Sequence, residues 1–196
     1  MFAKGFPKFL ESDVKYVCSN IPFNTYRRVT EAESDEKSTW KISDKDSVSI
    51  PYRIYLTDCV EKAEENFTDI QTVIYHCIFT RSCNGFVREK HIRALLEADV
   101  PYWAVPYILK VCDEYVVQIL EAVYERLSEA DTMLYKEIWR LNPKKFICGY
   151  SRMISYWNEF YRDECPIFKD YIGKALFEKC FGYTRSMEKI FRIVSF

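Results

Sequence analysis

The chain has 196 residues, of which 48% are hydrophobic and 17% aromatic, and its 28 Lys and Arg residues nearly balance 29 Asp and Glu residues, for a formal net charge of −1. This apolar content excludes a disordered chain. Because basic residues do not outnumber acidic ones, the sequence lacks the strongest indication of a nucleic-acid-binding protein. The length fits one domain with at most an appendage.

No targeting or membrane segment is predicted. Glu11, Ser12 and Asp13 interrupt the N-terminal apolar residues before they reach the length of a secretory segment. No stretch approaches the roughly 18 uninterrupted apolar residues of a membrane span. We therefore expect a cytoplasmic protein without membrane contact, whose eight cysteines are reduced thiols that are mostly buried.

Residues 1–56 are expected to form an N-terminal segment that packs on the rest of the chain. A short helix is favoured over residues 8–18 by its apolar spacing. Residues 39–50 favour a small β-hairpin, because apolar and polar residues alternate on both sides of the turn-like run from Ser43 to Ser47. Residues 52–56 then form a further extended segment.

From residue 57 to residue 196 the apolar residues recur at helical spacing, which predicts a mainly α-helical domain. After a first helix over 59–66, Thr68 and Gln71 have the spacing of a capping box. The next helix carries an inward stripe and is expected to end at Asn84-Gly85; the stripe consists of Ile70, Val73, Ile74, Cys77 and Ile78.

Further helices are predicted over 86–97, 101–112, 115–127, 131–141, 144–162, 167–181 and 185–194. Pro106 lies inside the second of these, so that helix is expected to begin late or to kink. The aromatic stripe of the 144–162 helix is interpreted as core rather than as a ligand box.

The helices are arranged as a weak internal repeat. A shift of 29 residues places Phe86-Val87 over Tyr115-Val116, and the helix-turn-helix units cover about 69–98, 101–128 and 131–162. The run from Gly85 to Leu96 resembles the second helix of a HEAT repeat, with Arg88 at the helix-start arginine of that family. His91 stands where Ala is usual, and the period is shorter than the roughly 40 residues typical of HEAT repeats.

This resemblance implies a HEAT-like α-solenoid of stacked antiparallel helix pairs. Stacking is also expected on physical grounds, because a helix pair of this length cannot bury its own apolar stripe. The concave face of such a stack implies recognition of a protein or peptide, and less often of nucleic acid.

One cluster of residues could carry chemistry. His76, Cys77, Cys83 and His91 are four potential zinc ligands within 16 residues, and the same residues could supply a nucleophilic Cys/His pair. The spacing lacks a short zinc knuckle and no third orienting group is evident, so buried thiols and surface histidines are the favoured interpretation. The carboxylates Glu61, Glu64 and Glu65 are interpreted as solvated. No phosphate-binding or hydrolase motif is present, and we expect no metal, no cofactor and no enzymatic activity.

Charge and aromatic residues indicate where a partner would bind. Two basic groups flank an acidic stretch over 113–131, and Tyr102 and Trp103 beside Pro101 are candidate aromatic anchors. Alternating charge suits a charged protein partner, although an ordinary solvated surface explains it as well. The predicted binding residues are Arg81, Arg88, Lys90, Arg93, Tyr102, Trp103, Arg140, Lys144 and Lys145; Arg152 belongs to the second basic group.

The sequence thus predicts a non-enzymatic protein-binding module, with the neutralisation of a toxin or effector, as by an immunity protein, as one specific role. The alternative is a nucleic-acid-binding or nucleic-acid-processing protein on a helical-repeat scaffold. In that case Arg81, Arg88, Lys90, Arg93, Arg140, Lys144 and Lys145 would line one groove and contact phosphates.

Overall fold

The structure, a computed structural model, describes residues 2–22, 24–25, 30–57 and 66–187 and is mainly helical. The contacts divide the chain into two compact units, Met1–Tyr107 and Ile108–Phe196, here called unit 1 and unit 2. The boundary between the two units lies within helix α4 (Val105–Val111). Most of the predicted helix over 59–66 and most of the one over 185–194 lie outside the described residues.

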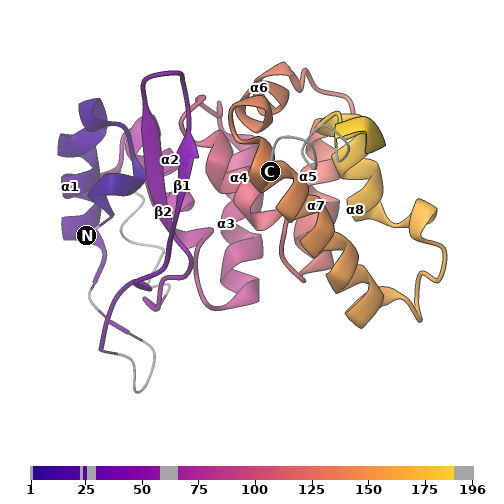
Figure 1. The fold of residues 1–196 in the computed structure, drawn as a ribbon. Coiled ribbons are helices and arrows are strands. Elements are labelled where there is room, and N and C mark those ends of the chain that lie inside the picture. The colour runs from indigo at the N-terminus through magenta and orange to yellow at the C-terminus, as the bar shows by residue number, and fades with distance from the viewer. Residues whose placement is uncertain (1, 23, 26–29, 58–65, 188–196) are drawn as a thin grey trace. The chain divides into compact units, whose positions relative to one another are not determined.

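Unit 1 begins with two short 3₁₀ turns, Ala3–Gly5 and Lys8–Leu10, and with helix α1 (Glu11–Asn20). Strands β1 (Lys37–Lys41) and β2 (Ser47–Pro51) then form an antiparallel ladder in which Trp40 pairs with Val48 (Figure 1). The range 39–50, for which the sequence predicts a hairpin, lies inside this ladder. Its apolar side chains alternate with polar ones, so that one face of the ladder is buried.

Helix α2 (Asp69–Phe79) confirms the predicted capping box. The Gln71 amide donates to Thr68 Oγ1 at 3.3 Å, and the Thr68 amide donates to Gln71 Oε1 at 3.2 Å. Gln71 also donates to Asp13 of α1 at 2.8 Å. Most of the predicted inward stripe of α2 is buried, but Ile70, in the first turn of the helix, is 50% exposed.

Helix α3 (Gly85–Glu97) packs on α2. The prediction that Asn84-Gly85 ends the preceding helix is wrong. Asn84 Oδ1 accepts a hydrogen bond from the Phe86 amide at 3.0 Å, so Asn84 caps the start of α3 and Gly85 is its first residue.

Unit 2 contains α5 (Val117–Leu127), α6 (Met133–Leu141), α7 (Pro143–Tyr156) and the short α8 (Ile172–Ala175). Helix α7 widens into a π-helical turn at Trp157–Tyr161, and α8 continues into a second one at Leu176–Cys180. The predicted 167–181 helix is therefore interrupted, since residues 168–170 form a 3₁₀ turn before α8 begins. Figure 1 shows these helices in colours that run from salmon-pink at α5 through orange at α7 to yellow at α8. The predicted late start of the 101–112 helix is confirmed, since α4 begins at Val105 and Pro106 lies in its first turn.

The described cysteines are all free thiols. Cys77, Cys112 and Cys180 are buried, whereas Cys148 on α7 is exposed. Burial raises the pKa of the Cys77 and Cys112 thiols well above the ordinary value.

In the part of the chain that the structure describes, no helix combines the length and the apolar character needed to cross a membrane.

Gly5 is required by its close approach to Tyr107. The Tyr107 hydroxyl is buried and donates to the Gly5 carbonyl at 2.9 Å, and a Cβ atom on Gly5 would lie 2.5 Å from Tyr107 Oη. We expect Gly5→Ala to lower the free energy of unfolding by about 1–3 kcal/mol through this overlap. In the double variant with Tyr107→Phe, which removes the clashing oxygen, the loss measured by urea unfolding should be smaller than the sum of the two single losses. Additive losses would show that the two groups do not meet.

Candidate binding pocket on unit 2

The corner between α6 and α7 is fixed by Asn142. Its amide donates to the Trp139 carbonyl at 2.9 Å, and its side-chain Nδ2 donates to the Ile138 carbonyl at 2.8 Å. These bonds satisfy carbonyls at the end of α6, because the last carbonyls of a helix have no amide of the same helix to accept from. Pro143 then occupies the first position of α7, where its missing N–H costs nothing. The two helices are therefore joined by a defined bend.

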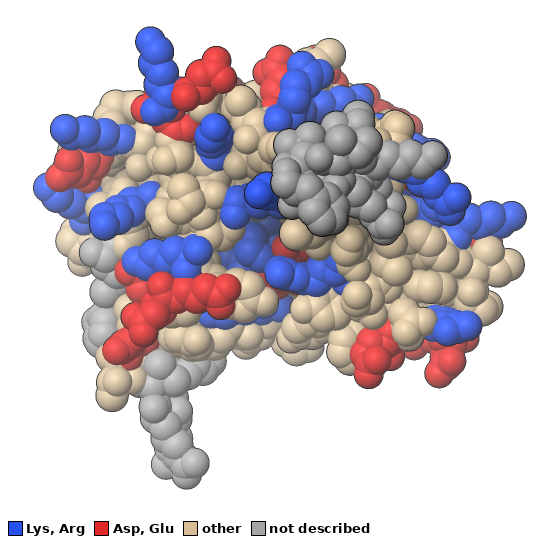
Figure 2. Space-filling model, in the orientation of Figure 1, with Lys and Arg blue, Asp and Glu red and all other residues tan. Residues whose placement is uncertain are grey.

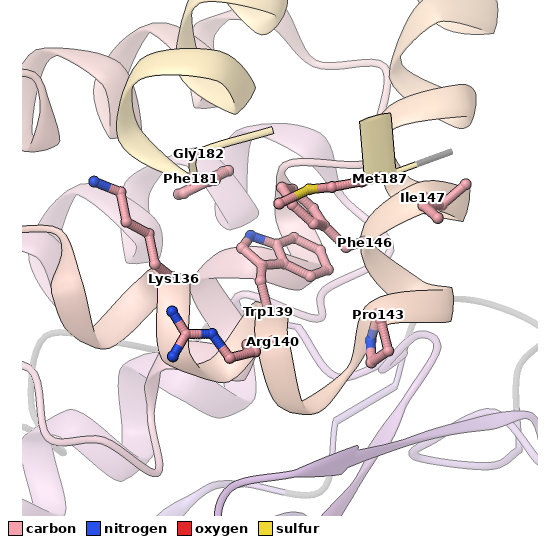
Figure 3. Close-up of a pocket in the computed structure, with 9 residues that line it drawn as sticks. All are labelled: Lys136, Trp139, Arg140, Pro143, Phe146, Ile147, Phe181, Gly182 and Met187. Carbon is pink, nitrogen blue, oxygen red and sulfur yellow. The ribbon is translucent and has the colours of Figure 1, made fainter. Parts of the chain in front are cut away.

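A cavity of about 390 Å³ lies against this corner. Figure 3 shows its lining, in which Trp139 occupies the centre. The residues that line it are Lys136, Trp139, Arg140, Pro143, Phe146, Ile147, Phe181, Gly182 and Met187. Apart from two cations and the indole N–H of Trp139, the side chains in this set are apolar.

The floor of the cavity is a stack of buried aromatic rings. The Trp139 and Phe146 rings stack with centroids 4.6 Å apart, and Phe146 stacks in turn on Phe177 at 5.9 Å. Phe181 lies 6.1 Å from Trp139. Because these rings are held by one another as well as by the helices, the floor is preformed.

The two cations are Lys136 and Arg140, one helical turn apart on α6. In Figure 3 their charged groups lie on one side of Trp139, and Ile147 and Met187 lie on the other. Arg140 is exposed, whereas Lys136 is partly covered. Among the residues that the structure describes, neither side chain has a carboxylate within ion-pair distance.

Gly182 shapes the same edge of the cavity. Its φ of 75° lies in the left-handed region that favours glycine. A Cβ atom here would lie 3.6 Å from Lys136 Cε. The aliphatic part of Lys136 thus crosses the Gly182 backbone, which leaves the ammonium group at the rim.

The other predicted cations of unit 2 differ in how available they are. Lys144 is exposed. Lys145 is half-buried, and this burial lowers its pKa, although Asp113 opposes the shift. Arg152 donates to Asp113 Oδ2 at 3.0 Å, and the buried Lys110 donates to Asp113 Oδ1 at 2.9 Å. Arg152 is therefore committed to an ion-pair network.

The predicted binding residues of unit 1 need correction. Arg81 and Arg88 are fully buried and cannot contact a partner. Arg81 donates to the carbonyls of Pro51, Thr80 and Tyr52 at 2.7–3.3 Å. Arg88 Nη1 donates to the carbonyls of Ser82 and Cys83 at 2.8 and 3.2 Å. Both guanidinium groups thus donate to backbone carbonyls, which lie at the end of β2, at the end of α2 and in the turn that follows α2.

The other predicted residues of unit 1 are divided between surface and core. Trp103 is buried against Phe6, with ring centroids 5.8 Å apart, whereas Tyr102 is 40% exposed. Lys90 and Arg93 are exposed, and Arg93 pairs with Glu89 at 3.1 Å.

A hollow of about 520 Å³ in unit 1 is lined by charged residues of both signs, so it favours neither an anionic nor a cationic ligand; these residues are Lys4, Lys8, Glu11 and Asp46.

The structure brings the two histidines together. His76 Nδ1 lies 2.9 Å from His91 Nδ1, so the N–H of one ring donates a hydrogen bond to the other ring. Both are buried, and Tyr75 and Phe79 lie beside His91. The described residues contain no group of three or more His, Cys, Asp or Glu side chains placed to hold a metal ion. The prediction of surface histidines is wrong, because these rings fill the contact between α2 and α3.

Comparison with known proteins gives no relationship, since no protein family, no curated protein and no solved structure matches the chain. The pocket must therefore be interpreted from its own chemistry.

The sequence interpretation included Arg140 but missed Lys136, Trp139 and the other residues that line the pocket. One available signal was the pattern Lys136-x-x-Trp139-Arg140, which places two cations beside a tryptophan on one helix. The contributions of Gly182 and Met187 had no such signal, because they come from a distant part of the chain.

The buried guanidinium of Arg81 yields a stability test. Arg81→Leu would leave three carbonyls without their donor, and we expect the free energy of unfolding to fall by about 2–4 kcal/mol. The matched variant Arg93→Leu removes an exposed arginine with one helical ion pair and should cost at most about 0.5 kcal/mol. Urea unfolding followed by tryptophan fluorescence measures both, and equal losses would contradict the structural role of Arg81.

Two glycines of unit 2 test the shape of the pocket edge. Gly182→Ala should cost about 1–2 kcal/mol, because an L side chain is strained at this φ. Gly149→Ala, in the interior of α7, should be neutral or stabilising, since its Cβ would make only ordinary contacts from 3.5 Å outward. Thermal unfolding of the two variants distinguishes them. If Gly182→Ala were as stable as the parent chain, the left-handed conformation would be refuted.

Proposed function

We propose that the chain is a non-enzymatic protein-binding module and that its partner docks on the α6–α7 face of unit 2, defined by Lys136, Arg140 and Lys144 around the pocket. The observation that carries this proposal is the combination of a preformed aromatic floor with cations that have no carboxylate partner among the described residues. Tryptophan and arginine dominate the energetic centres of protein interfaces. Cations at the rim accelerate the approach of an acidic partner and select against a basic one.

The nucleic-acid alternative receives less support. Of the seven cations assigned to a phosphate-binding groove, Arg81 and Arg88 are buried and Arg93 pairs with Glu89. On the face drawn in Figure 2, Asp and Glu side chains lie among the Lys and Arg side chains. A protein that tracks a phosphate backbone needs a contiguous set of exposed cations. Stacking into a HEAT-like solenoid and an immunity-like role stay predictions.

The test uses charge reversal on the full chain. The double variant Arg140→Glu/Lys144→Glu should lose the partner that the parent chain retains from an extract of its own host, with binding reduced about tenfold or more in a purified assay. The matched control Lys90→Glu/Arg93→Glu reverses two exposed cations of unit 1 and should keep that partner. Quantitative mass spectrometry of the captured proteins, followed by titration of the purified partner, measures the effect.

Two results would contradict the proposal. One is a partner that the Arg140→Glu/Lys144→Glu variant retains but the unit 1 variant loses, since that partner would bind elsewhere. The other is retention of the parent chain on DNA at low salt that falls steeply as salt is raised, because this slope is the signature of phosphate contacts.

A further inference from the structure

The pocket also indicates what chemistry the partner presents. We propose that it receives one large apolar or aromatic side chain from an acidic peptide segment, with carboxylates of that segment at Lys136 and Arg140. This inference rests on the proposed function and adds the identity of the anchor.

The size of the cavity sets the first limit. At about 390 Å³ it lies near the lower end of the range of roughly 300–1,000 Å³ over which pockets enclose ligands. It has room for a single bulky group and not for a packed secondary-structure element. Lys136, Arg140 and the indole N–H of Trp139 are the side-chain hydrogen-bond donors in the lining, whereas Pro143, Phe146 and Ile147 can neither donate nor accept. The part of the ligand that packs against these three residues is therefore apolar.

The preformed floor favours an aromatic anchor. Trp139 is 2% exposed and stacked on Phe146, so only part of its ring faces the cavity and that part is fixed. A ligand that docks on a fixed surface loses less free energy to ordering than one that must arrange loose side chains. Because Trp139, Phe146 and Phe181 are almost fully buried, an incoming ring packs mainly on the half-buried Pro143, Ile147 and Met187 and reaches only a narrow part of Trp139.

The charges fix the orientation of the ligand. In Figure 3 the Lys136 ammonium and the Arg140 guanidinium lie on the opposite side of Trp139 from Ile147 and Met187, so the pocket has one cationic end and one apolar end. No Asp or Glu is among the residues that line it. A basic segment would therefore meet repulsion without compensation, whereas a carboxylate beside the anchor meets two cations.

The cations outside the pocket distinguish a peptide from a small carboxylate. Lys144 is exposed at the start of α7, directly after Pro143, and does not itself line the cavity. A free aromatic acid that fills the pocket has no group left for Lys144. A peptide with several acidic residues around its anchor extends across α7 and uses this charge as well. The surface thus fits an acidic segment of a protein.

The experiment measures binding of fluorescein-labelled short peptides to the full chain by anisotropy. The probe has one Phe flanked by Glu residues. Replacement of its Phe by Ala should weaken binding about tenfold or more, because burial of the ring is lost, and replacement of its Glu residues by Lys should abolish binding. The chain variant Lys136→Glu/Arg140→Glu should no longer bind the probe. The control variant Lys169→Glu changes an exposed lysine of unit 2 outside the pocket and should bind the probe as the parent chain does.

A second variant tests the apolar end without removing a cation. Ile147 is only partly buried, so the uncharged polar variant Ile147→Asn should fold, which circular dichroism checks, and should weaken binding of the probe by a similar factor. Binding that survives Phe→Ala in the probe, or that persists in both chain variants, would overturn the inference. Equal affinity for N-acetylphenylalanine and for the acidic probe would also overturn it, in favour of a small-molecule site.

The two proposals can fail separately. If the captured partner depends on Arg140 and Lys144 but excess probe does not displace it, the anchor inference is wrong and the docking face stands. If the probe binds as expected but no captured partner depends on these residues, the pocket chemistry is right and the docking proposal fails.

Discussion

A cation can be buried in this molecule only where oxygen atoms surround it, and this constraint determines which basic residues are left for function. Arg81 and Arg88 are held by backbone carbonyls of unit 1, and Lys110 is held by Asp113 in unit 2. An isolated buried charge would cost several kcal/mol, so these acceptors are a condition of the fold. Lys136 and Arg140 face no such acceptor among the described residues, and their charge is available to a ligand.

The same constraint explains which parts of the sequence interpretation hold. Helical periodicity locates α2, α5 and α6 because each helix must hide an apolar face, and the capping box at Thr68 and Gln71 follows from local hydrogen bonding. Such features depend on residues within a few positions of each other. They can be predicted from one sequence because no distant contact changes them.

Features set by distant contacts could not be predicted in this way. A composition argument places Arg81 and Arg88 on the surface, since arginine is rarely buried without partners. Their partners are carbonyls of the Pro51-Tyr52 segment and of the turn after α2, whose positions only the folded chain defines. Asn84 can equally end one helix or begin the next, and its hydrogen bond to the Phe86 amide decides between them.

The aromatic residues of unit 2 show why core and site could not be separated in the sequence. The sequence predicts that the aromatic stripe of the 144–162 helix is core, and Phe146 is indeed buried, yet the same ring lines the pocket. Whether a buried ring also faces a cavity depends on what covers it from the other side. Here Phe181, Gly182 and Met187 leave a gap above Trp139, and they arrive from a part of the chain about forty residues away.

A single pocket of this size cannot by itself support tight association. Stable interfaces bury about 800 Å² on each partner, and most of that area contributes by excluding water around a few strong contacts. Lys144, exposed directly after the pocket residue Pro143, and Met133, exposed three residues before Lys136 on α6, could contribute to such a surrounding contact area. Exclusion of water would in turn strengthen the attraction between the rim cations and a carboxylate, because the interaction is screened less in a drier environment. The apolar floor and the cationic rim therefore reinforce each other only when a ligand carries both groups.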